Sequence, residues 1–238
     1  MPTIVFASSK GGAGKTTAAV ILASELARQG AAKGINIALI DADPNQHSAA
    51  WANKEGRPEN IQLFENATEE SILDAIDEAE NNAGFVLVDL EGVASSAVIG
   101  AVSRADLVVI PCQPSQNDAK EAVKTIKTIQ YSARVAGRTI PFAVLFTRLS
   151  AAIITKTGKH LAAEFDGAGV ELFECSLIDR EPFKSVFSYG GTVNTLEGSN
   201  KREQESINKA ADNAKIFAEE VKRKLKTNIE QKKRAANG

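Results

Sequence analysis

The sequence has few cysteines, few aromatic residues and almost no net charge, and each shortage excludes a class of protein. Its two cysteines among 238 residues, Cys112 and Cys175, lie far apart without metal-ligand spacing, so neither a disulfide framework nor a metal cluster is indicated. A reducing cytoplasm is the expected setting. The formal net charge of −2 provides no global attraction to nucleic acid or to an anionic membrane, so such binding needs a local basic patch.

Long hydrophobic runs are also missing. No stretch approaches the roughly 20 apolar residues that cross a bilayer, and the first residues lack the charged start and long apolar core of a signal peptide. The remaining composition is ordinary, 43% hydrophobic and 24% charged, which excludes a disordered or collagen-like chain. A chain of this length can bury a core as one α/β domain or as two small ones.

Short β-branched runs alternate with longer helical patterns, which is typical of βαβ units around a parallel sheet. The expected strands are mostly apolar, as in strands covered by helices on both faces. They span residues 3–7, 36–40, 85–88, 106–110, 142–146 and 170–173. The expected helices span residues 16–29, 69–81, 119–136 and 156–165. Because no linker interrupts this rhythm, we expect one domain over residues 1–200.

The last part of the chain, residues 201–238, has a different pattern. Apolar residues recur there at helical spacing: Ile207, Ala210, Ala214, Phe217, Val221 and Leu225. This spacing predicts one amphipathic helix that starts near Lys201 and docks on the domain. Beyond Leu225 the chain is rich in Lys and Arg and ends in Ala-Ala-Asn-Gly, which predicts a frayed basic tail.

A glycine-rich segment follows the first expected strand, with the sequence Lys10-Gly11-Gly12-Ala13-Gly14-Lys15-Thr16-Thr17. Its glycines let the backbone N–H groups point inward, where they and the positive end of the next helix form a cradle for phosphates. Lys15 then contacts the β and γ oxygens, and Thr16 offers its hydroxyl to Mg²⁺. A chance glycine-rich turn is the alternative, but the whole segment matches in the strand–loop–helix context. The sequence therefore predicts ATP and Mg²⁺ as ligands.

Ser9 stands where the ordinary phosphate loop has its first glycine, and an additional lysine, Lys10, follows it. The pattern Lys-Gly-Gly-x-Gly-Lys-Thr-Thr resembles the deviant Walker A box of the ParA/MinD superfamily, which also contains the nitrogenase iron proteins. The resemblance implies a single P-loop NTPase domain with a mostly parallel sheet, helices on both faces, and ATP hydrolysis. It also implies an ATP-dependent homodimer in which Lys10 reaches the phosphates bound by the other subunit.

Two later strands end in carboxylates, which face the ligand crevice when they lie at the carboxyl edge of a parallel sheet. By resemblance, Asp43 polarises the attacking water and Asp41 supports the Mg²⁺ shell. Alone, the Asp-x-Asp-Pro segment is equally consistent with a structural turn. The apolar run 85–88 ends in Asp89 and resembles a Walker B strand whose acid holds Mg²⁺. There Leu90-Glu91-Gly92 replaces the threonine and proline that usually follow in the family.

Two further segments resemble the same superfamily. The run Pro111-Cys112-Gln113-Pro114 resembles the segment after its fourth strand, and residues 178–183 resemble its base-binding loop. The resemblance implies that Arg180 packs on the adenine or crosses the dimer. A surface arginine that begins a short helix is the alternative.

The branches of the superfamily differ in function. The redox branch needs two cysteines in exposed loops, whereas Cys112 and Cys175 lie in or after apolar strands and are expected to be core thiols. MinD-like members end in a membrane anchor. The tail here has the charge but only a thin apolar face, so membrane binding is not favoured.

The ParA-like branch remains, which partitions plasmids or chromosomes through ATP-dependent, non-specific DNA binding. The resemblance implies a ParB-like or other adaptor that stimulates slow hydrolysis. Because the sequence begins at the phosphate-loop strand, we expect no N-terminal helix-turn-helix. The short form with an Asp-x-x-Gly Walker B end also resembles the VirC1 proteins of T-DNA transfer. A MinD-like ATPase that positions a complex is the other alternative.

Basic residues late in the chain are the candidate DNA contacts, and their binding to DNA would place the protein on the nucleoid. The alternative is a lysine-rich helix face that is merely solvated. The candidates are Lys201, Arg202, Lys209, Lys215, Lys222, Arg223, Lys224 and Lys226.

Overall fold

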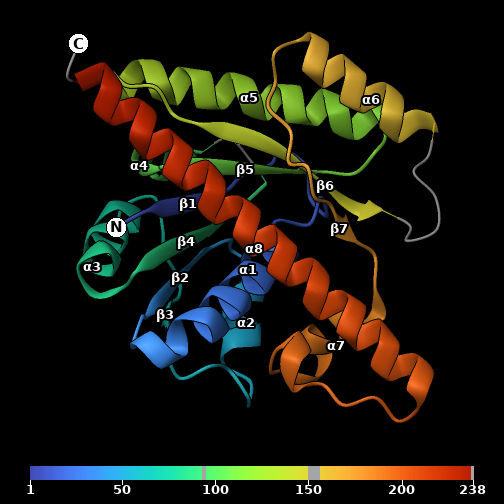
Figure 1. Ribbon diagram of the computed structural model, residues 1–238. Helices are drawn as coiled ribbons and strands as arrows, with labels where there is room; N and C mark the ends of the chain where they lie inside the picture. The colour runs from blue at the N-terminus through green and yellow to red at the C-terminus, as the bar shows by residue number, and fades with distance from the viewer. Residues whose placement is uncertain (93–94, 150–155, 237–238) are drawn as a thin grey trace.

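The computed structural model describes residues 1–92, 95–149 and 156–236, and within them a parallel sheet lies between two layers of helices (Figure 1). The order of the strands in this sheet is β3-β2-β4-β1-β5-β6-β7, and all their pairings are parallel. The strands are β1 (Thr3–Phe6), β2 (Ile37–Ala42), β3 (Ile61–Phe64), β4 (Phe85–Leu90), β5 (Leu107–Cys112), β6 (Phe142–Leu149) and β7 (Leu177–Ile178).

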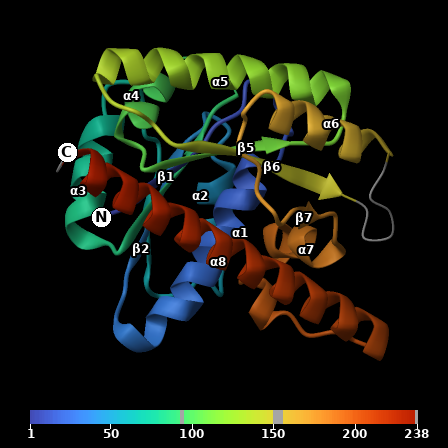
Figure 2. The same cartoon turned by 45° about the horizontal axis from the view of Figure 1, so that its top comes forward.

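The helices divide between the two faces of the sheet (Figures 1 and 2). One face is covered by α1 (Lys15–Gly30), α2 (His47–Ala52), α7 (Glu181–Tyr189) and α8 (Lys201–Ala236). The other is covered by α3 (Ile72–Asn82), α4 (Ser96–Arg104), α5 (Gln116–Ala136) and α6 (Lys156–Gly167). The predicted α/β fold with helices on both faces is confirmed.

The apolar strands fit this arrangement because successive side chains of a strand point to opposite faces of the sheet. In β1, Ile4 and Phe6 pack against the layer that contains α1 and α8. Val5 between them packs against the opposite layer. Both faces are therefore buried, which accounts for strands with almost no polar residues.

The strand predicted at residues 170–173 is wrong. Leu172 forms only an isolated parallel bridge with Val144, and the edge strand of the sheet is β7 instead. The backbone N–H groups of Glu174 and Cys175 donate to the Glu220 carboxylate of α8, at 2.7 and 2.8 Å, and not to β6. The short elements β3, β7, α2 and α4 were not predicted, and α7 was expected only in the alternative interpretation of Arg180 as the start of a short helix.

The C-terminal helix α8 runs across the molecule over α1 in both cartoon views (Figures 1 and 2). It starts at Lys201 and buries the whole predicted apolar stripe, from Ile207 to Leu225. The predicted fraying beyond Leu225 is corrected, because α8 continues to Ala236. None of the described helices combines the length and hydrophobicity that crossing a bilayer requires.

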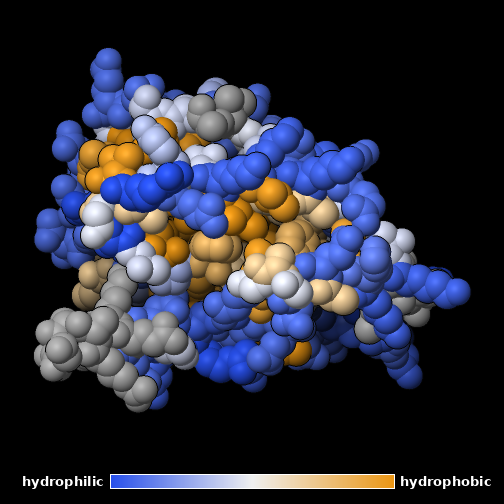
Figure 3. Space-filling view, turned by 90° about the horizontal axis from the view of Figure 1, so that it is seen from above, coloured by the Kyte–Doolittle hydropathy of each residue, from blue (hydrophilic) through white to orange (hydrophobic). Residues whose placement is uncertain are grey.

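The side of the molecule that carries α5 and α6 differs from the charged outer face of α8. Seen from that side, hydrophobic residues lie in the middle of the surface between hydrophilic borders (Figure 3). On α5 itself, Val123, Tyr131 and Val135 are exposed. Part of the exposed hydrophobic surface of the protein therefore lies on α5.

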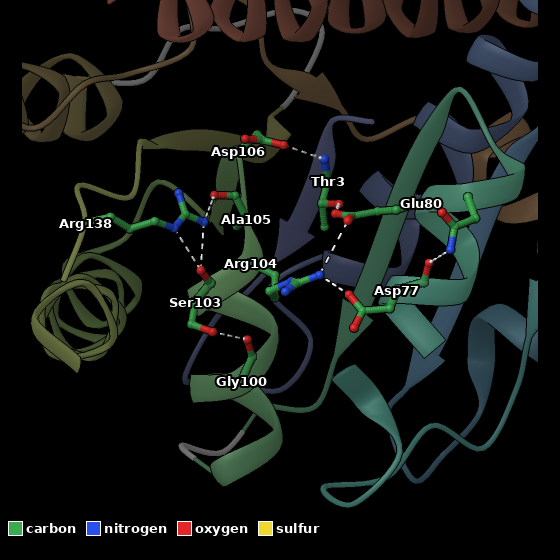
Figure 4. A network of polar contacts seen from close by, with 10 residues as sticks. Thr3, Asp77, Glu80, Gly100, Ser103, Arg104, Ala105, Asp106 and Arg138 are labelled. Carbon is green, nitrogen blue, oxygen red and sulfur yellow. Dashed lines mark hydrogen bonds and ion pairs between the residues drawn. The ribbon is translucent and has the colours of Figure 1, made fainter. Parts of the chain in front are cut away.

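A polar network ties the elements together at the amino-terminal edge of the sheet (Figure 4). The backbone N–H of Thr3 donates to Asp106 at 3.0 Å, and its hydroxyl donates to Glu80 of α3 at 2.7 Å. Arg104 of α4 forms ion pairs with Asp77 and Glu80. At this edge the polar side chains are occupied by contacts within the chain. The carboxyl-terminal edge is therefore the edge at which a ligand can bind.

The docking of α8 can be tested at two neighbouring residues. Phe217 is fully buried and packs edge-to-face on Phe173, with ring centroids 5.7 Å apart, whereas Ile216 is exposed. We expect Phe217→Ala to lower the free energy of unfolding by about 4 kcal/mol because it leaves a cavity. Ile216→Ala should change it by about 0.5 kcal/mol. Urea denaturation measures both, and similar losses would contradict the docked orientation of α8.

Candidate functional site

The loop between β1 and α1 has the geometry of a phosphate cradle. Gly12 and Gly14 adopt φ angles of +76° and +103°, a left-handed conformation that glycine tolerates without strain. The carbonyls of Gly12 and Ala13 accept hydrogen bonds from Gln113 Nε2 at 3.1 Å and from Thr147 Oγ1 at 2.7 Å. Because neighbouring strand ends hold the carbonyls, the N–H groups are left for an anion.

A cavity of 520 Å³ opens beside this loop. The predicted residues that line it are Gly11, Gly12, Gly14, Lys15, Thr16, Thr17 and Asp43. Lys15 begins α1 and is buried, so its charge is withdrawn from bulk water and concentrated at the cavity. Ala13 is buried and takes part through its backbone only. Gly92 lies against the loop, since a Cβ there would come within 3.4 Å of the Gly11 nitrogen.

Two buried carboxylates lie side by side at this edge, because Asp41 of β2 pairs in register with Asp89 of β4. Asp41 accepts the N–H groups of Asp43 at 3.0 Å and Ala49 at 2.8 Å. Asp89 Oδ2 accepts the Ser48 hydroxyl at 2.6 Å, while its buried Oδ1 has no partner among the described residues. Burial raises the pKa of Asp89 to about 7 and also raises the pKa of Asp41.

The unsatisfied oxygen of Asp89 fits a cation, because a buried carboxylate is costly unless a charge or donor compensates it. The Thr16 hydroxyl lies close enough to Asp89 to lower the pKa of that carboxyl against the larger effect of burial, so two of the three predicted Mg²⁺ residues are neighbours. Within the described residues, no three His, Cys, Asp or Glu side chains gather into a metal cluster. This donor set suits Mg²⁺, which usually combines one or two carboxylates with substrate phosphates and water.

Asp43 is at once a turn residue and a cavity residue. Its Oδ1 accepts the backbone N–H and the side-chain amide of Asn45, both at 2.9 Å. The same residue lines the phosphate cavity and is only half-buried. The two interpretations of the Asp-x-Asp-Pro segment are therefore compatible.

A second cavity, of 470 Å³, adjoins the first and is lined by β7 and the start of α7. Arg180 precedes α7 and lines this cavity, and its buried Nε has no hydrogen-bond partner in the described chain. Asn213 of α8 holds the segment that precedes Arg180. Its side chain accepts the Ile178 N–H at 3.0 Å and donates to the Ser176 carbonyl at 2.8 Å. The position and the free donor of Arg180 suit a nucleotide base.

Lys10 does not point freely outward but is held within its own chain. Its Nζ lies 2.8 Å from the carboxylate of Asp118, which is buried at the start of α5. Burial works against ionisation of Asp118, but hydrogen bonds from Lys10 and Ser115 hold its pKa below the ordinary value. The preceding Ser9 donates its hydroxyl to the carbonyl and the carboxylate of Glu121. The first part of the loop is therefore attached to α5.

The candidate DNA contacts on α8 fall into two groups. Lys201, Arg202, Lys209, Lys215 and Lys226 are exposed, and none forms an ion pair within the described part of the chain. The others are already engaged.

The engaged group is Lys222, Arg223 and Lys224. Lys222 pairs with Glu219 at 2.7 Å, and Arg223 pairs with Glu174 at 2.8 Å. Lys224 is buried, pairs with Glu171 at 2.5 Å and lies 5.0 Å from the centre of the Phe173 ring. The prediction that Lys224 belongs to the basic DNA-binding patch is therefore wrong, because its side chain is buried within the fold.

Both cysteines are free thiols that line neither nucleotide cavity. Burial raises the pKa of Cys112 to about 12 and raises that of Cys175 as well. A thiol with a raised pKa is a poor nucleophile and a poor metal ligand, which fits the expected role in the core.

Among the residues that hold the site in place, the sequence analysis missed Ser48, Asp118 and Thr147. Only Asp118 carries a local signal, because Ser115 three residues earlier is a helix N-cap whose hydroxyl accepts the Asp118 N–H at 3.1 Å. Ser48 and Thr147 act on partners 41 and 134 residues away, and no local pattern reports such contacts.

Comparisons with known proteins find relatives over almost the whole chain. Residues 1–231 match the family model of the VirC1 protein. A ParA protein of Rhizobium radiobacter is 39% identical over 225 residues, which cover 94% of this chain and 98% of that protein. A virC1 protein of Rhizobium rhizogenes is 28% identical over 226 residues, covering 93% and 94%. The structure of an ATP complex of Cyanothece McdA shares the fold, with a TM-score of 0.73 and 17% identity over 93% of this chain and 96% of that one.

The raised pKa of Asp89 predicts an unusual dependence of stability on pH. Between its ordinary pKa near 3.8 and its folded value of about 7, the folded protein keeps a proton that the unfolded chain has released. In EDTA, the free energy of unfolding should therefore fall, by on the order of a few kcal/mol, as the pH rises through this window. Asp89→Asn should remove much of the fall.

The control for this experiment is Asp74→Asn, which alters an exposed carboxylate of α3. Denaturant titrations of the three proteins at about pH 5 and pH 8 give the comparison. If wild type and Asp89→Asn lose the same stability across the window, Asp89 does not retain its proton in the fold.

Proposed function

The chain belongs to the VirC1 family within the ParA/MinD superfamily of ATPases, and from this premise we propose that it dimerises with ATP, binds DNA non-specifically and drives plasmid or chromosome partition. One observation carries the proposal: the phosphate loop, the paired carboxylates Asp41 and Asp89, and the additional Lys10 meet at one edge of the sheet. The 39% identity to a ParA protein supports the partition role.

The two cavities support the proposed binding of Mg-ATP. The loop N–H groups and Lys15 hold the phosphates, Thr16 and Asp89 hold Mg²⁺ with Asp41 in support, and Arg180 lies at the base. The McdA structure with ATP supports this choice of nucleotide. Hydrolysis to ADP and phosphate uses water polarised by Asp43. It is slow, because the catalysis consists of positioning and electrostatics that a second subunit completes.

Lys10 links nucleotide binding to dimer formation. In the monomer its charge is satisfied by Asp118. On dimerisation, Lys10 exchanges Asp118 for the phosphates bound in the other subunit. These phosphates carry more negative charge than one carboxylate and accept charge-assisted hydrogen bonds. An adaptor of the ParB type then stimulates hydrolysis, and loss of the γ-phosphate releases the dimer.

DNA binding is assigned to the exposed basic residues of α8. An ATP dimer brings two copies of this helix face into one complex, so more phosphates can be contacted than by a monomer. Lys201, Arg202, Lys209 and Lys215 form the core of this face, and Lys222 and Arg223 contribute less because acids neutralise them. The dimer would then associate with the nucleoid.

A second candidate function is favoured by the match of residues 1–231 to the VirC1 family. In this role the same ATP-dependent DNA binding serves DNA transfer between cells as an accessory activity. The two functions share the site and differ in the adaptor and in the DNA.

The role of Lys10 is tested by comparing it with Lys15. We expect Lys15→Ala to abolish ATP binding and Lys10→Ala to retain it. Lys10→Ala should fail to dimerise with ATP, because the second subunit's phosphates lose their cation. Calorimetry and sedimentation velocity measure these effects, with the exposed Lys33→Ala as the control. A Lys10→Ala protein that dimerises with ATP like wild type would refute the trans contact.

The DNA face is tested by two double variants that each remove two positive charges from α8. Lys209→Ala/Lys215→Ala removes free charges and should weaken ATP-dependent DNA binding about tenfold, with a shallower salt dependence. Lys222→Ala/Arg223→Ala removes charges already paired with Glu219 and Glu174, and should have a smaller effect. Co-sedimentation with non-specific DNA across a salt series measures both.

Anionic liposomes provide the comparison for the same proteins, with and without ATP. Binding to liposomes but not to DNA would replace the partition role with membrane positioning. Equal effects of the two double variants would refute the division of α8 into free and neutralised charges.

A further inference from the structure

Arg148, near the end of β6, has an unusual backbone and lies at the junction of the two nucleotide cavities. We propose that Arg148 is a nucleotide-binding residue whose guanidinium holds the α-phosphate, and that its strained backbone conformation is maintained for this contact. The inference rests on the proposed ATP binding and adds to that site a residue that no sequence motif indicated.

The strain at Arg148 comes from an irregularity in the sheet. Thr147 pairs with Leu177 and Leu149 pairs with Ile178, so Arg148 is an extra residue on β6 without a counterpart on β7. Its φ of +54° lies in the left-handed region, which is sterically unfavourable for a residue with a long side chain. An extra residue of this kind beside a site redirects a side chain that would otherwise follow the pleat.

The residues on either side of Arg148 are anchored. Thr147 is buried and donates to the Ala13 carbonyl of the phosphate loop at 2.7 Å, and the Leu149 carbonyl accepts the Asp179 N–H at 2.9 Å. The backbone around Arg148 is therefore fixed between the phosphate loop and the segment that carries Arg180. This fixed setting holds the strained conformation in place.

The side chain of Arg148, by contrast, forms no stabilising polar contact with the described part of the chain. It is exposed, and it has no hydrogen bond or ion pair in the described part of the chain. Gln46 provides the comparison, because it has a φ of +49° but donates from its side chain to the carbonyl of Asp43 at 2.7 Å. The side chain of Gln46 thus forms a contact that offsets its strain, whereas at Arg148 only the anchored neighbours hold the conformation and the side chain itself contributes no hydrogen bond.

The position of Arg148 indicates what it binds. Three residues line both cavities: Gly14, Thr17 and Arg148. With the β- and γ-phosphates at Lys15 and the base at Arg180, the ribose and the α-phosphate must cross this junction. A guanidinium presents a planar set of donors that matches phosphate oxygens, so it provides a second cation at the inner phosphate.

The test uses a substitution with opposite effects on two measurements. Arg148→Gly removes the guanidinium and also removes the steric conflict, since glycine adopts positive φ freely. Its melting temperature should therefore equal or exceed that of wild type. Its affinity for ATP and for ADP should fall about tenfold, as expected for loss of hydrogen bonds to a charged group. Binding of adenosine, which has no phosphate, should be unchanged.

Two controls separate the backbone from the charge. Asn66→Gly alters another residue of positive φ, outside both cavities, and should leave the affinity for ADP unchanged. Arg134→Ala removes an exposed arginine of α5, and it reports the effect of net charge alone. Arg148→Lys should recover part of the affinity, because it restores a point charge without the planar donors.

The outcomes are distinct. If wild type binds ADP and Arg148→Gly binds it equally, Arg148 is only a solvated residue in an irregular strand, and the inference is overturned. A large fall in the melting temperature of Arg148→Gly would overturn the claim of unrelieved strain. If wild type binds neither ATP nor ADP, the proposed ATPase function itself fails.

Discussion

The parallel pairing of β1, β2 and β4 is the constraint on which the site depends. Because these neighbouring strands run in the same direction, the phosphate loop after β1 and the carboxylates Asp41 and Asp89 reach the same edge. The register then places the two aspartates directly opposite each other, and a shift by one residue would turn their side chains to the other face. At the opposite edge, Thr3, Glu80 and Arg104 tie strands and helices together (Figure 4).

Burial turns this arrangement into a site that needs a ligand. Lys15, Asp41 and Asp89 are all withdrawn from water, where an incompletely paired charge is costly. Asp41 is satisfied by backbone N–H groups, but one oxygen of Asp89 and the Nε of Arg180 have no partner in the described chain. A nucleotide with its Mg²⁺ offers the missing anion and cation together. Without a ligand these groups have no partner in the described chain. Such unsatisfied buried groups are typical of a binding site, where they lower the stability of the ligand-free protein.

Sequence reasoning succeeded where the controlling interactions are local. The glycine-rich loop and the stripe of α8 are each set by glycines or by apolar spacing within one segment, and the structure has the loop between β1 and α1 and the stripe buried, as predicted. Residues 170–173 form only an isolated bridge to β6, and the pairing ends after Phe173 because the next two backbone N–H groups, of Glu174 and Cys175, bond to the Glu220 carboxylate about 45 positions later. Lys224 failed for a related reason, since Glu171 and Phe173 draw a nominally exposed lysine into the fold. Hydrogen bonds and ion pairs between residues so far apart in the chain leave no periodic pattern in the sequence.

The helix α8 connects the base cavity with the surface assigned to DNA. Its inner face holds the segment before Arg180 through Asn213 and Glu220, whereas its outer face carries the free lysines. Phe217 and its apolar neighbours fix the helix on α1, which itself starts at Lys15. A nucleotide bound across the two cavities as proposed would therefore contact elements that meet α8 at both the phosphate and the base. If α8 binds DNA as proposed, any shift of the helix that fits DNA would change the same two contacts, and the affinities for nucleotide and DNA would then be linked in both directions.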